Sequence, residues 1–336
     1  MAEEQNSDRF AVMLVNLGTP DEPTPGAVRR YLAEFLWDKR VVDAPRWLWW
    51  LILNGIILRF RPRRVARLYA SVWLKDGSPL MHYTKSLAEK LEARLTASLG
   101  QPVPVIPAMT YGNPSIAAGS KRLRQENIKK LIVLPLYPQF SATTTAAAFD
   151  ALAKQLKPCP DVPEILFIRD YHAHPAYIEA LKQSVVRYSE GAETPDELVM
   201  SFHGIPRRYH SQGDPYPLEC HKTGELLAES LGLNDDQWRL TFQSRFGREE
   251  WLQPYTDKTM ESLPKAGTRK IQVICPGFAV DCLETLEEIQ EENRKIFQEA
   301  GGESFQYIPC LNDSDEQVSL LNQLIKEKAA AFIKTI

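Results

Sequence analysis

Short apolar runs recur along the chain in two series, and a longer amphipathic stretch follows most of them. Apolar runs bounded by Gly or Pro predict buried strands, and apolar residues at three- and four-residue intervals predict helices. The predicted strands span residues 9–17, 102–109, 130–137 and 164–168, and then 197–202, 238–243, 270–275 and 304–308. The predicted helices span residues 25–35, 65–69, 81–99, 115–125, 143–156, 175–188, 218–231, 250–263, 283–300 and 317–334.

Strands that alternate with helices are typical of right-handed βαβ units and of a parallel sheet. Two series of four strands therefore predict an α/β protein with two similar halves and a cleft between them. A single eight-stranded barrel is the competing topology, because it has the same alternation of strands and helices. No sequence repeat relates the two halves.

A histidine directly follows one of these strands. Residues 197–202 form a mostly apolar run, His203 comes next, and Gly204 and Pro206 then break the strand. Ligands of open parallel sheets bind outside the carboxyl ends of the strands, so His203 is placed to extend its imidazole into a ligand crevice. The alternative is a histidine that only caps the strand by bonding to a nearby carbonyl group.

A row of glutamates follows the strand at residues 270–275. Glu284, Glu288 and Glu292 stand four residues apart on one face of the predicted helix, where like charges repel. One interpretation is a solvated face with acids near the positive end of the helix. The other is a track that binds a cation or relays protons. A carboxylate and the imidazole of His203 together suit a divalent first-row metal such as Fe(II).

One apolar run, residues 47–58, is too short for a membrane span, which needs about 20 residues. It carries three tryptophans, Trp47, Trp49 and Trp50, and arginines follow it. An amphipathic segment of this kind is suited to a membrane surface. It is equally suited to the mouth of a pocket for a flat apolar ligand, and an ordinary core helix is the third interpretation.

Composition limits these interpretations. The 336 residues suit one large or two medium domains, and the net charge of −3 gives no indication of nucleic-acid binding. The N-terminus lacks the basic and apolar regions of a secretory signal. The five cysteines are widely spaced, which predicts a reducing, cytosolic compartment without a disulfide framework or a structural zinc site. The turn after the first strand lacks the glycine fingerprint of a dinucleotide site.

Five motifs, in order along the chain, resemble those of the ferrochelatases, which insert Fe(II) into a porphyrin to make haem. They are SFHGIP at residues 201–206, GDPYP at 213–217, FQSRFG at 242–247, WLQPYT at 251–256 and CLETL at 282–286. The resemblance begins at residue 14 and extends to the last helix, so it covers essentially the whole chain. Several motifs in the right order are far more specific than any one of them.

The resemblance implies two Rossmann-like domains, each with a four-stranded parallel sheet, around an active-site cleft. We expect an N-terminal domain at residues 1–174, with an apolar lip at about 37–60, joined by the C-terminal helix 313–336. The C-terminal domain is expected at residues 175–312. His203 takes the family's catalytic histidine position on one porphyrin face, and Glu284 takes the catalytic glutamate position across the cleft. Both are implied as metal ligands.

The resemblance also implies an outer path for metal or protons along Glu288 and Glu292, on a helix with a π-type turn. Further positions match residues that contact the porphyrin ring or its propionates. These implied porphyrin-binding residues are Leu17, Arg61, Tyr69, Ser78, Tyr111 and Trp251.

Three departures from the family pattern modify these expectations. The chain lacks the cysteine-rich extension that holds an iron–sulfur cluster in some members, and Ala142 stands where some relatives have a cysteine. We therefore expect no cluster and no resident cofactor. Thr110 replaces an arginine of some members, which weakens part of the propionate contact. Cys282 replaces a histidine, which weakens a metal relay through that position.

The implied function is insertion of Fe²⁺ into protoporphyrin IX, the last step of haem biosynthesis. We expect a cytoplasmic monomer with no nucleic-acid partner and with peripheral membrane contact through residues 47–58. One alternative is a porphyrin or haem carrier without catalysis, which has no use for Glu284 opposite His203. A second alternative is a chelatase for coproporphyrin or for cobalt or nickel, which predicts a more basic pocket mouth than residues 47–58 provide. A third is a nucleotide-binding α/β protein.

Overall fold

The computed structural model describes residues 9–191, 193–247 and 249–332, and the chain divides into two compact units. The first unit comprises the chain up to Leu136, Ala142–Arg169 and the chain from Asp313; the second comprises Tyr137–Ser141 and Asp170–Asn312. This division differs from the expected boundary at residue 174, since residues 137–141 and 170–174 belong to the second unit.

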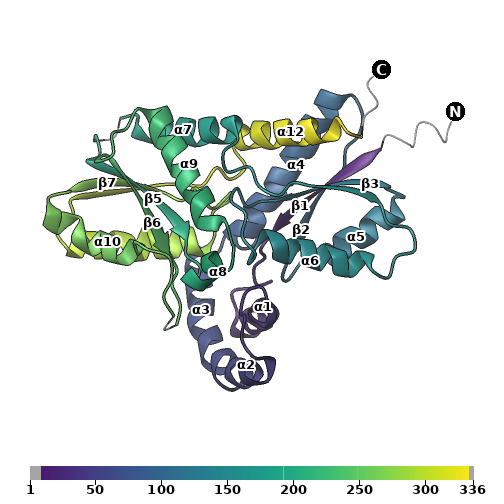
Figure 1. Ribbon diagram of the computed structural model, residues 1–336, viewed down its shortest axis with the longest axis horizontal. Helices are drawn as coiled ribbons and strands as arrows, with labels where there is room; N and C mark the ends of the chain where they lie inside the picture. Colours follow the sequence, from purple (N-terminus) through teal and green to yellow (C-terminus); the bar gives the residue numbers. More distant parts are fainter. Residues whose placement is uncertain (1–8, 192, 248, 333–336) are drawn as a thin grey trace. The chain divides into compact units, whose positions relative to one another are not determined.

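The first unit is built on a four-stranded parallel sheet with the strand order β2-β1-β3-β4 (Figure 1). Its strands are β1 (Phe10–Asn16), β2 (Val105–Met109), β3 (Lys130–Pro135) and β4 (Glu164–Phe167). Its helices are α1 (Pro25–Trp37), α2 (Arg46–Ile52), the π-helix η2 (Leu53–Ile57), α3 (Leu58–Val72), α4 (Pro79–Leu99), α5 (Ile116–Gln125), α6 (Thr145–Leu156) and α12 (Asp315–Ala329). Every residue of β1 is buried, as expected for a central strand that is covered on both faces.

The second unit repeats this plan, with the strand order β6-β5-β7-β8 (Figure 1). Its strands are β5 (Glu197–His203), β6 (Trp238–Gln243), β7 (Lys270–Ile274) and β8 (Ser304–Ile308). Its helices are α7 (Pro175–Ser189), α8 (Arg207–Ser211), α9 (Tyr216–Leu231), α10 (Thr256–Ser262), the 3₁₀ helix η3 (Pro264–Ala266), the π-helix η4 (Glu284–Asn293) and α11 (Arg294–Glu299). The α/β class with two four-stranded parallel sheets is confirmed, and the eight-stranded barrel is wrong.

The strand order gives each sheet a topological switch point, where the chain changes the direction in which it adds strands. The switch point lies between β1 and β3 in the first unit and between β5 and β7 in the second. The carboxyl ends of parallel strands at a switch point are where such sheets bind ligands. In the second unit, the strand that ends at His203 is one of the two strands at this point.

Several predicted helices differ from the observed elements. The helix expected at residues 65–69 is part of the longer α3, and the helix expected at residues 317–334 ends at Ala329 in α12, with residues 333–334 outside the described residues. The helix expected at residues 250–263 begins only at Thr256. Trp251 pairs with Pro206 in an isolated bridge, residues 252–254 form a bend, and the Pro254 carbonyl accepts a hydrogen bond from the Phe242 amide. The residue before a proline is also biased away from the helical region. The helix expected at residues 283–300 is mostly a π-helix, η4, and only its last part, α11, is α-helical.

The apolar run at residues 47–58 is helical, formed by α2, η2 and the start of α3. Within the ranges that the structure describes, no helix combines the length and the apolar character that crossing a bilayer requires. Whether residues 47–58 form a surface segment or a core helix therefore depends on which of their side chains are exposed.

Candidate active site

His203 ends the central strand β5 and is only partly buried, whereas the six residues before it are buried. Its Nδ1 lies 2.7 Å from the carbonyl oxygen of Gly204. A carbonyl can only accept, so Nδ1 carries the proton and donates it. The neutral imidazole therefore keeps its lone pair on Nε2, which has no hydrogen-bond partner among the described residues. The hydrogen bond to a carbonyl group that a simple capping histidine would make is therefore present. The same bond fixes the tautomer that leaves Nε2 free to accept a proton.

The loop after His203 is held by a short pairing with the segment before α10. The Leu252 amide donates to the Ile205 carbonyl at 3.0 Å, and the Arg207 amide donates to the Glu250 carbonyl at 2.9 Å. Gly204 sits in a close approach, since a Cβ there would lie 2.8 Å from the Gln243 carbonyl oxygen and 3.2 Å from the Trp251 ring. The pairing of residues 250–252 with this loop thus fixes the loop whose carbonyl orients the imidazole.

Gln243 connects the histidine strand to the glutamate helix. It is paired with His203 across β5 and β6 and is 3% exposed. Its side-chain oxygen accepts a hydrogen bond from Ser201 Oγ at 2.8 Å, and its amide nitrogen donates to the Glu284 carbonyl at 2.8 Å. One buried side chain therefore bonds both to the strand that ends at His203 and to the first residue of η4.

The chain entering η4 is anchored by the buried carboxylate of Asp281. This carboxylate accepts hydrogen bonds from the hydroxyl groups of Thr285 at 2.9 Å and Tyr307 at 2.5 Å, and from the Asn312 amide at 2.7 Å. Burying a carboxylate is costly unless such donors satisfy it. The network fixes the three residues between Asp281 and Thr285, and Glu284 is one of them.

Glu288, one turn further along η4, is bound by a residue with an unusual backbone. Ser244 has a φ of 65°, in the left-handed region that L residues rarely adopt. In this conformation its amide donates to Glu288 Oε1 at 2.7 Å, and its hydroxyl donates to Oε2. Burial nevertheless raises the pKa of the Glu288 carboxyl to about 7, helped by the charges of Glu284 and Glu292 and opposed by the two bonds from Ser244.

The three glutamates run from the interior of the second unit to its surface. Glu284 and Glu288 are partly buried, and Glu292 is exposed. Glu292 also lines a surface cavity of about 540 Å³ with Glu287, Glu291, Arg294, Lys295 and Gln298. A carboxyl with a pKa near 7 in the middle of this row takes up and releases a proton near neutral pH. The solvated-face interpretation therefore fits Glu292 but not Glu288.

In the first unit, two of the predicted porphyrin-contacting residues meet at the carboxyl ends of β1 and β2. The Tyr111 amide donates to the Leu17 carbonyl at 2.9 Å, and the Tyr111 hydroxyl donates to Asp38 at 2.8 Å. Gly18 lies between them with a φ of 117°, and a Cβ there would lie only 1.8 Å from the Tyr111 carbonyl oxygen. Leu17 is partly exposed and Tyr111 is buried.

The remaining porphyrin-contact candidates differ in their surroundings. Ser78 is buried and caps α4, because its hydroxyl accepts a hydrogen bond from the Met81 amide at 3.2 Å. Tyr69 is buried and packs edge-on against Trp73. Arg61 and Trp251 are partly buried, and the Trp251 indole nitrogen has no partner among the described residues. Contact of these residues with a porphyrin stays a prediction.

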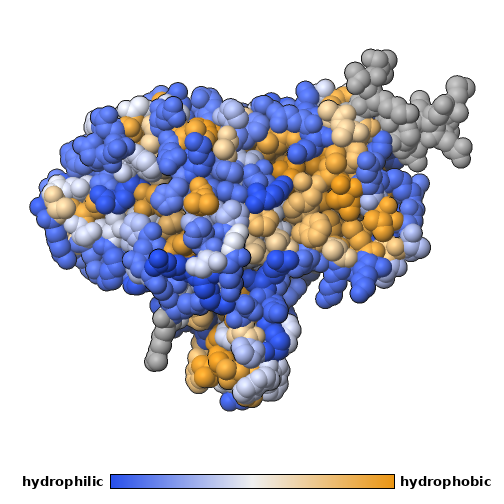
Figure 2. Space-filling view, viewed as in Figure 1, coloured by the Kyte–Doolittle hydropathy of each residue, from blue (hydrophilic) through white to orange (hydrophobic). Residues whose placement is uncertain are grey.

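The tryptophans of the apolar run do not share one environment. Trp47 and Trp50 are 71% and 54% exposed, but Trp49 is 7% exposed and its indole nitrogen donates to the Leu36 carbonyl at 2.7 Å. Figure 2 shows hydrophobic side chains gathered on the surface over α2. The exposed lip, as we call it, consists of Trp47, Leu48, Trp50, Leu51, Ile56 and Phe60. Trp49 is a core residue and does not belong to it.

Two solved structures share this architecture over nearly the whole chain. The structure of SirB from Bacillus subtilis with Fe³⁺ has a TM-score of 0.56 and 13% identity, and the match covers 96% of each chain. CbiX, described as the terminal enzyme for biosynthesis of siroheme in denitrifying bacteria, has a TM-score of 0.51, 13% identity and coverage of 94% of this chain and 98% of that one. The two parallel sheets therefore define a chelatase-type α/β fold.

Sequence comparison is more specific. The ferrochelatase family model matches residues 9–329. The ferrochelatase of Vibrio cholerae is 54% identical over 321 residues, which cover 96% of this chain and 98% of that protein. The ferrochelatase of Erwinia tasmaniensis is 55% identical over 320 residues, with coverage of 95% and 98%. The chain belongs to the ferrochelatase family, which confirms the resemblance drawn from the five motifs.

The raised pKa of Glu288 predicts a pH dependence of stability. Between about pH 4.5, the ordinary value, and about pH 7, the folded protein holds a proton that the unfolded chain has released. The free energy of unfolding therefore receives a contribution from Glu288 that is present at low pH and is lost as the pH rises through 7. Glu288→Gln removes this contribution, which at about 1.4 kcal/mol per pKa unit amounts to at most about 3 kcal/mol.

Urea unfolding of wild type and Glu288→Gln at pH 5 and pH 8 tests this prediction. The difference in unfolding free energy between Glu288→Gln and wild type is expected to shift in favour of the variant from pH 5 to pH 8. Glu291→Gln, at an exposed position on the same helix, is expected to show no such shift. An equal effect of Glu288→Gln at both pH values would contradict the raised pKa.

Proposed function

We propose that this chain is a ferrochelatase that inserts Fe²⁺ into protoporphyrin IX to form protohaem, with His203 and Glu284 as its catalytic residues. Membership of the ferrochelatase family supports the reaction. The observation that carries the residue assignment is the His203 imidazole, which ends a switch-point strand with its lone pair on Nε2. A carrier that only holds a porphyrin needs no such tautomer.

Metallation of a porphyrin releases two pyrrole protons as Fe²⁺ takes their place, so the protein needs proton acceptors near the ring nitrogens. The Nε2 atom of His203 is suited to accept one proton, because an ordinary imidazole has a pKa of about 6.5. Once Nε2 is protonated, the Nδ1–H bond to the Gly204 carbonyl becomes charge-assisted and stronger. The same bond that selects the tautomer therefore stabilises the imidazolium that the reaction produces.

Glu284 is suited to bind the incoming Fe²⁺ or to take the second proton. Behind it, Glu288 gains and loses a proton at about pH 7 and Glu292 is exposed to solvent. Protons can therefore leave, or hydrated metal can enter, along this row of carboxylates. We propose that the row is the outer path and that Ser244 keeps Glu288 in line with it.

We expect no resident cofactor for this chemistry. Burial raises the pKa of four of the five cysteine thiols, Cys220, Cys275, Cys282 and Cys310, which disfavours the thiolate form that iron–sulfur clusters require. Protoporphyrin is favoured over a more carboxylated tetrapyrrole because the exposed lip is apolar. We also expect a cytoplasmic monomer.

Replacing the proposed proton acceptor tests the function. His203→Ala is expected to lower the rate of Zn²⁺ or Fe²⁺ insertion into protoporphyrin by at least about 100-fold, the usual lower bound for losing a general base. The rate is followed by the shift of the Soret band, porphyrin binding by fluorescence quenching, and folding by circular dichroism. His221→Ala, an exposed histidine on α9, is the control and should insert metal normally. Turnover by His203→Ala within twofold of wild type would refute the assignment.

We further propose that the exposed lip docks on a membrane surface. Its apolar side chains adjoin the exposed arginines Arg59, Arg63 and Arg64, a composition suited to a bilayer with anionic headgroups. Because the porphyrin ring is flat and apolar, such contact would bring the enzyme to the phase in which its substrate dissolves.

The double variant Trp47→Ser/Trp50→Ser is expected to weaken binding to anionic phospholipid vesicles by at least about tenfold, which corresponds to about 1.4 kcal/mol. Co-sedimentation measures the binding. Phe149→Ser removes an exposed aromatic residue of α6 outside the lip and should leave binding unchanged. If wild type does not bind the vesicles, or the double variant binds as well as wild type, the lip has no role at a membrane.

A further inference from the structure

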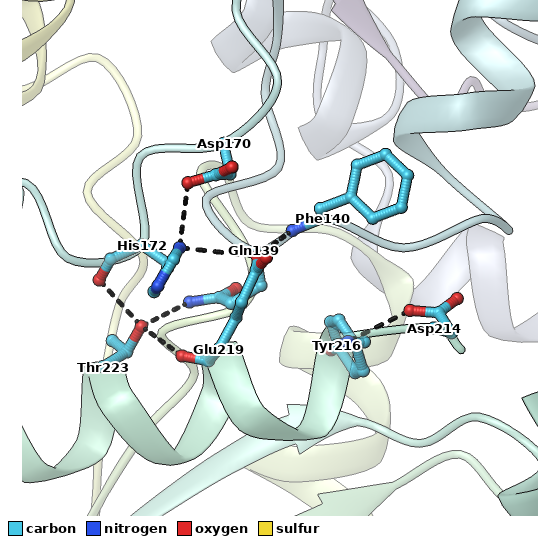
Figure 3. Close-up of polar contacts among 8 residues, drawn as sticks. All are labelled: Gln139, Phe140, Asp170, His172, Asp214, Tyr216, Glu219 and Thr223. Carbon is cyan, nitrogen blue, oxygen red and sulfur yellow. Dashed lines mark hydrogen bonds and ion pairs between the residues drawn. The ribbon is translucent and has the colours of Figure 1, made fainter. Parts of the chain in front are cut away.

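A second group of metal-ligating side chains lies in the second unit, apart from the glutamate row. It consists of Asp170, His172 and Glu219, and one ligand atom from each lies within 4.8 Å of the other two. Asp170 and His172 precede α7, and Glu219 lies in the first turn of α9. Figure 3 shows the three side chains converging from the loop and from the helix.

The His172 imidazole faces both carboxylates with the same nitrogen. Its Nδ1 lies 3.0 Å from Asp170 Oδ1 and 3.4 Å from Glu219 Oε2. A single N–H can donate well to only one of these oxygens. A cation bound to the Nδ1 lone pair would instead interact with all three atoms. Ligands of a tetrahedral ion such as Zn²⁺, at bond lengths of about 2.0–2.2 Å, lie about 3.3–3.6 Å apart. The separation from Glu219, 3.4 Å, falls in this range, and the separation from Asp170, 3.0 Å, is slightly shorter.

Surrounding groups hold these side chains in place. The Phe140 amide donates to Glu219 Oε2 at 2.6 Å, and Thr223 Oγ1 donates to the His172 carbonyl at 2.9 Å (Figure 3). The Gln139 amide in turn donates to Thr223 Oγ1 at 2.9 Å. Support of this kind behind the ligands is typical of metal sites, where it orients the donors and raises affinity.

The three side chains are largely, but not completely, shielded from solvent. The side chain of Glu219 is 9% exposed, and those of His172 and Asp170 are 19% and 24% exposed. A carboxylate as buried as Glu219 is stabilised by a positive charge close to it. A divalent cation at this point would supply such a charge and would use lone pairs of all three side chains.

We propose that Asp170, His172 and Glu219 form a second divalent-cation site, distinct from the substrate-metal site at His203 and Glu284. One imidazole with two carboxylates favours a first-row ion such as Zn²⁺, Mn²⁺ or Fe²⁺ over Mg²⁺ or Ca²⁺, which prefer oxygen ligands alone. The bound ion would join the loop where the chain enters the second unit, at Asp170, to the start of α9. The site therefore has a structural role and takes no part in porphyrin metallation.

Zn²⁺ binding to the full chain tests the proposal. The experiment uses a background variant, His203→Ala/Glu284→Gln, so that the proposed substrate-metal site contributes nothing. Calorimetry, with metal analysis after equilibrium dialysis, is expected to show one Zn²⁺ per chain. Co²⁺ bound in place of Zn²⁺ is expected to give visible d–d absorption of a four- or five-coordinate ion.

Three further substitutions in this background locate the ion. His172→Ala and Asp170→Asn are each expected to weaken Zn²⁺ binding by more than about 100-fold, since losing even a group behind a ligand costs about 10–100-fold. Because Asp170→Asn preserves the shape of the side chain, it keeps the test valid if His172→Ala misfolds. Circular dichroism checks the folding of both variants. His221→Ala, on the same helix as Glu219, should bind Zn²⁺ normally.

Failure of the background variant to bind Zn²⁺ would overturn the proposal and leave only a hydrogen-bonded group of three side chains. Zn²⁺ binding that survives both His172→Ala and Asp170→Asn would overturn it as well. Because no porphyrin is present, these results do not depend on whether His203 and Glu284 are catalytic.

Discussion

The candidate active site depends on one buried amide, the side chain of Gln243. Its oxygen can only accept and its nitrogen can only donate, so the two bonds to Ser201 and to the Glu284 carbonyl are not interchangeable. The main-chain carbonyl of the same residue accepts from the Gly204 amide at 2.8 Å. Gln243 thereby fixes the strand before His203, the residue after it and the first residue of the glutamate helix.

The carboxylates are positioned by local structure that is unfavourable by itself. A π-helix is rare and less stable than an α-helix, and it is found mostly at functional sites. The left-handed backbone of Ser244 costs about 1–2 kcal/mol. Both features lie at Glu288, whose pKa is raised by burial and further by the charges of Glu284 and Glu292. Asp281 and its donors hold the start of η4 and offset part of this cost. The result is a carboxyl group with a pKa of about 7, in the same unit as an imidazole with a fixed tautomer.

The alternation of strands and helices along the sequence predicted both sheets and the place of His203, because parallel strands are buried and end at glycine or proline turns. The motifs predicted the family because they are specific. Two of them lie at the ends of β5 and β6 and one lies at the start of η4, while the other two lie before α9 and α10. The sequence did not distinguish Trp49 from Trp47 and Trp50, because helical periodicity does not show which side of a short helix meets the core.

Other features depend on contacts that no local pattern records. Residues 250–252 have helix-compatible composition, but pairing with the loop after β5 keeps them out of the helix. The role of Gln243 requires β6 to lie beside β5, and a single glutamine in a strand gives no signal of it. Glu219 is far along the sequence from Asp170 and His172, and only the folded second unit brings the three together.

The protonation state of His203 is the most direct test of this account. In ¹⁵N NMR spectra of specifically labelled protein above pH 8, the two ring nitrogens of a neutral imidazole differ in chemical shift according to which one carries the proton. The account predicts a protonated Nδ1, bonded to the Gly204 carbonyl, and a bare Nε2. A His203 signal that shows the proton on Nε2 would contradict it, because the imidazole would then have no lone pair where the reaction needs one.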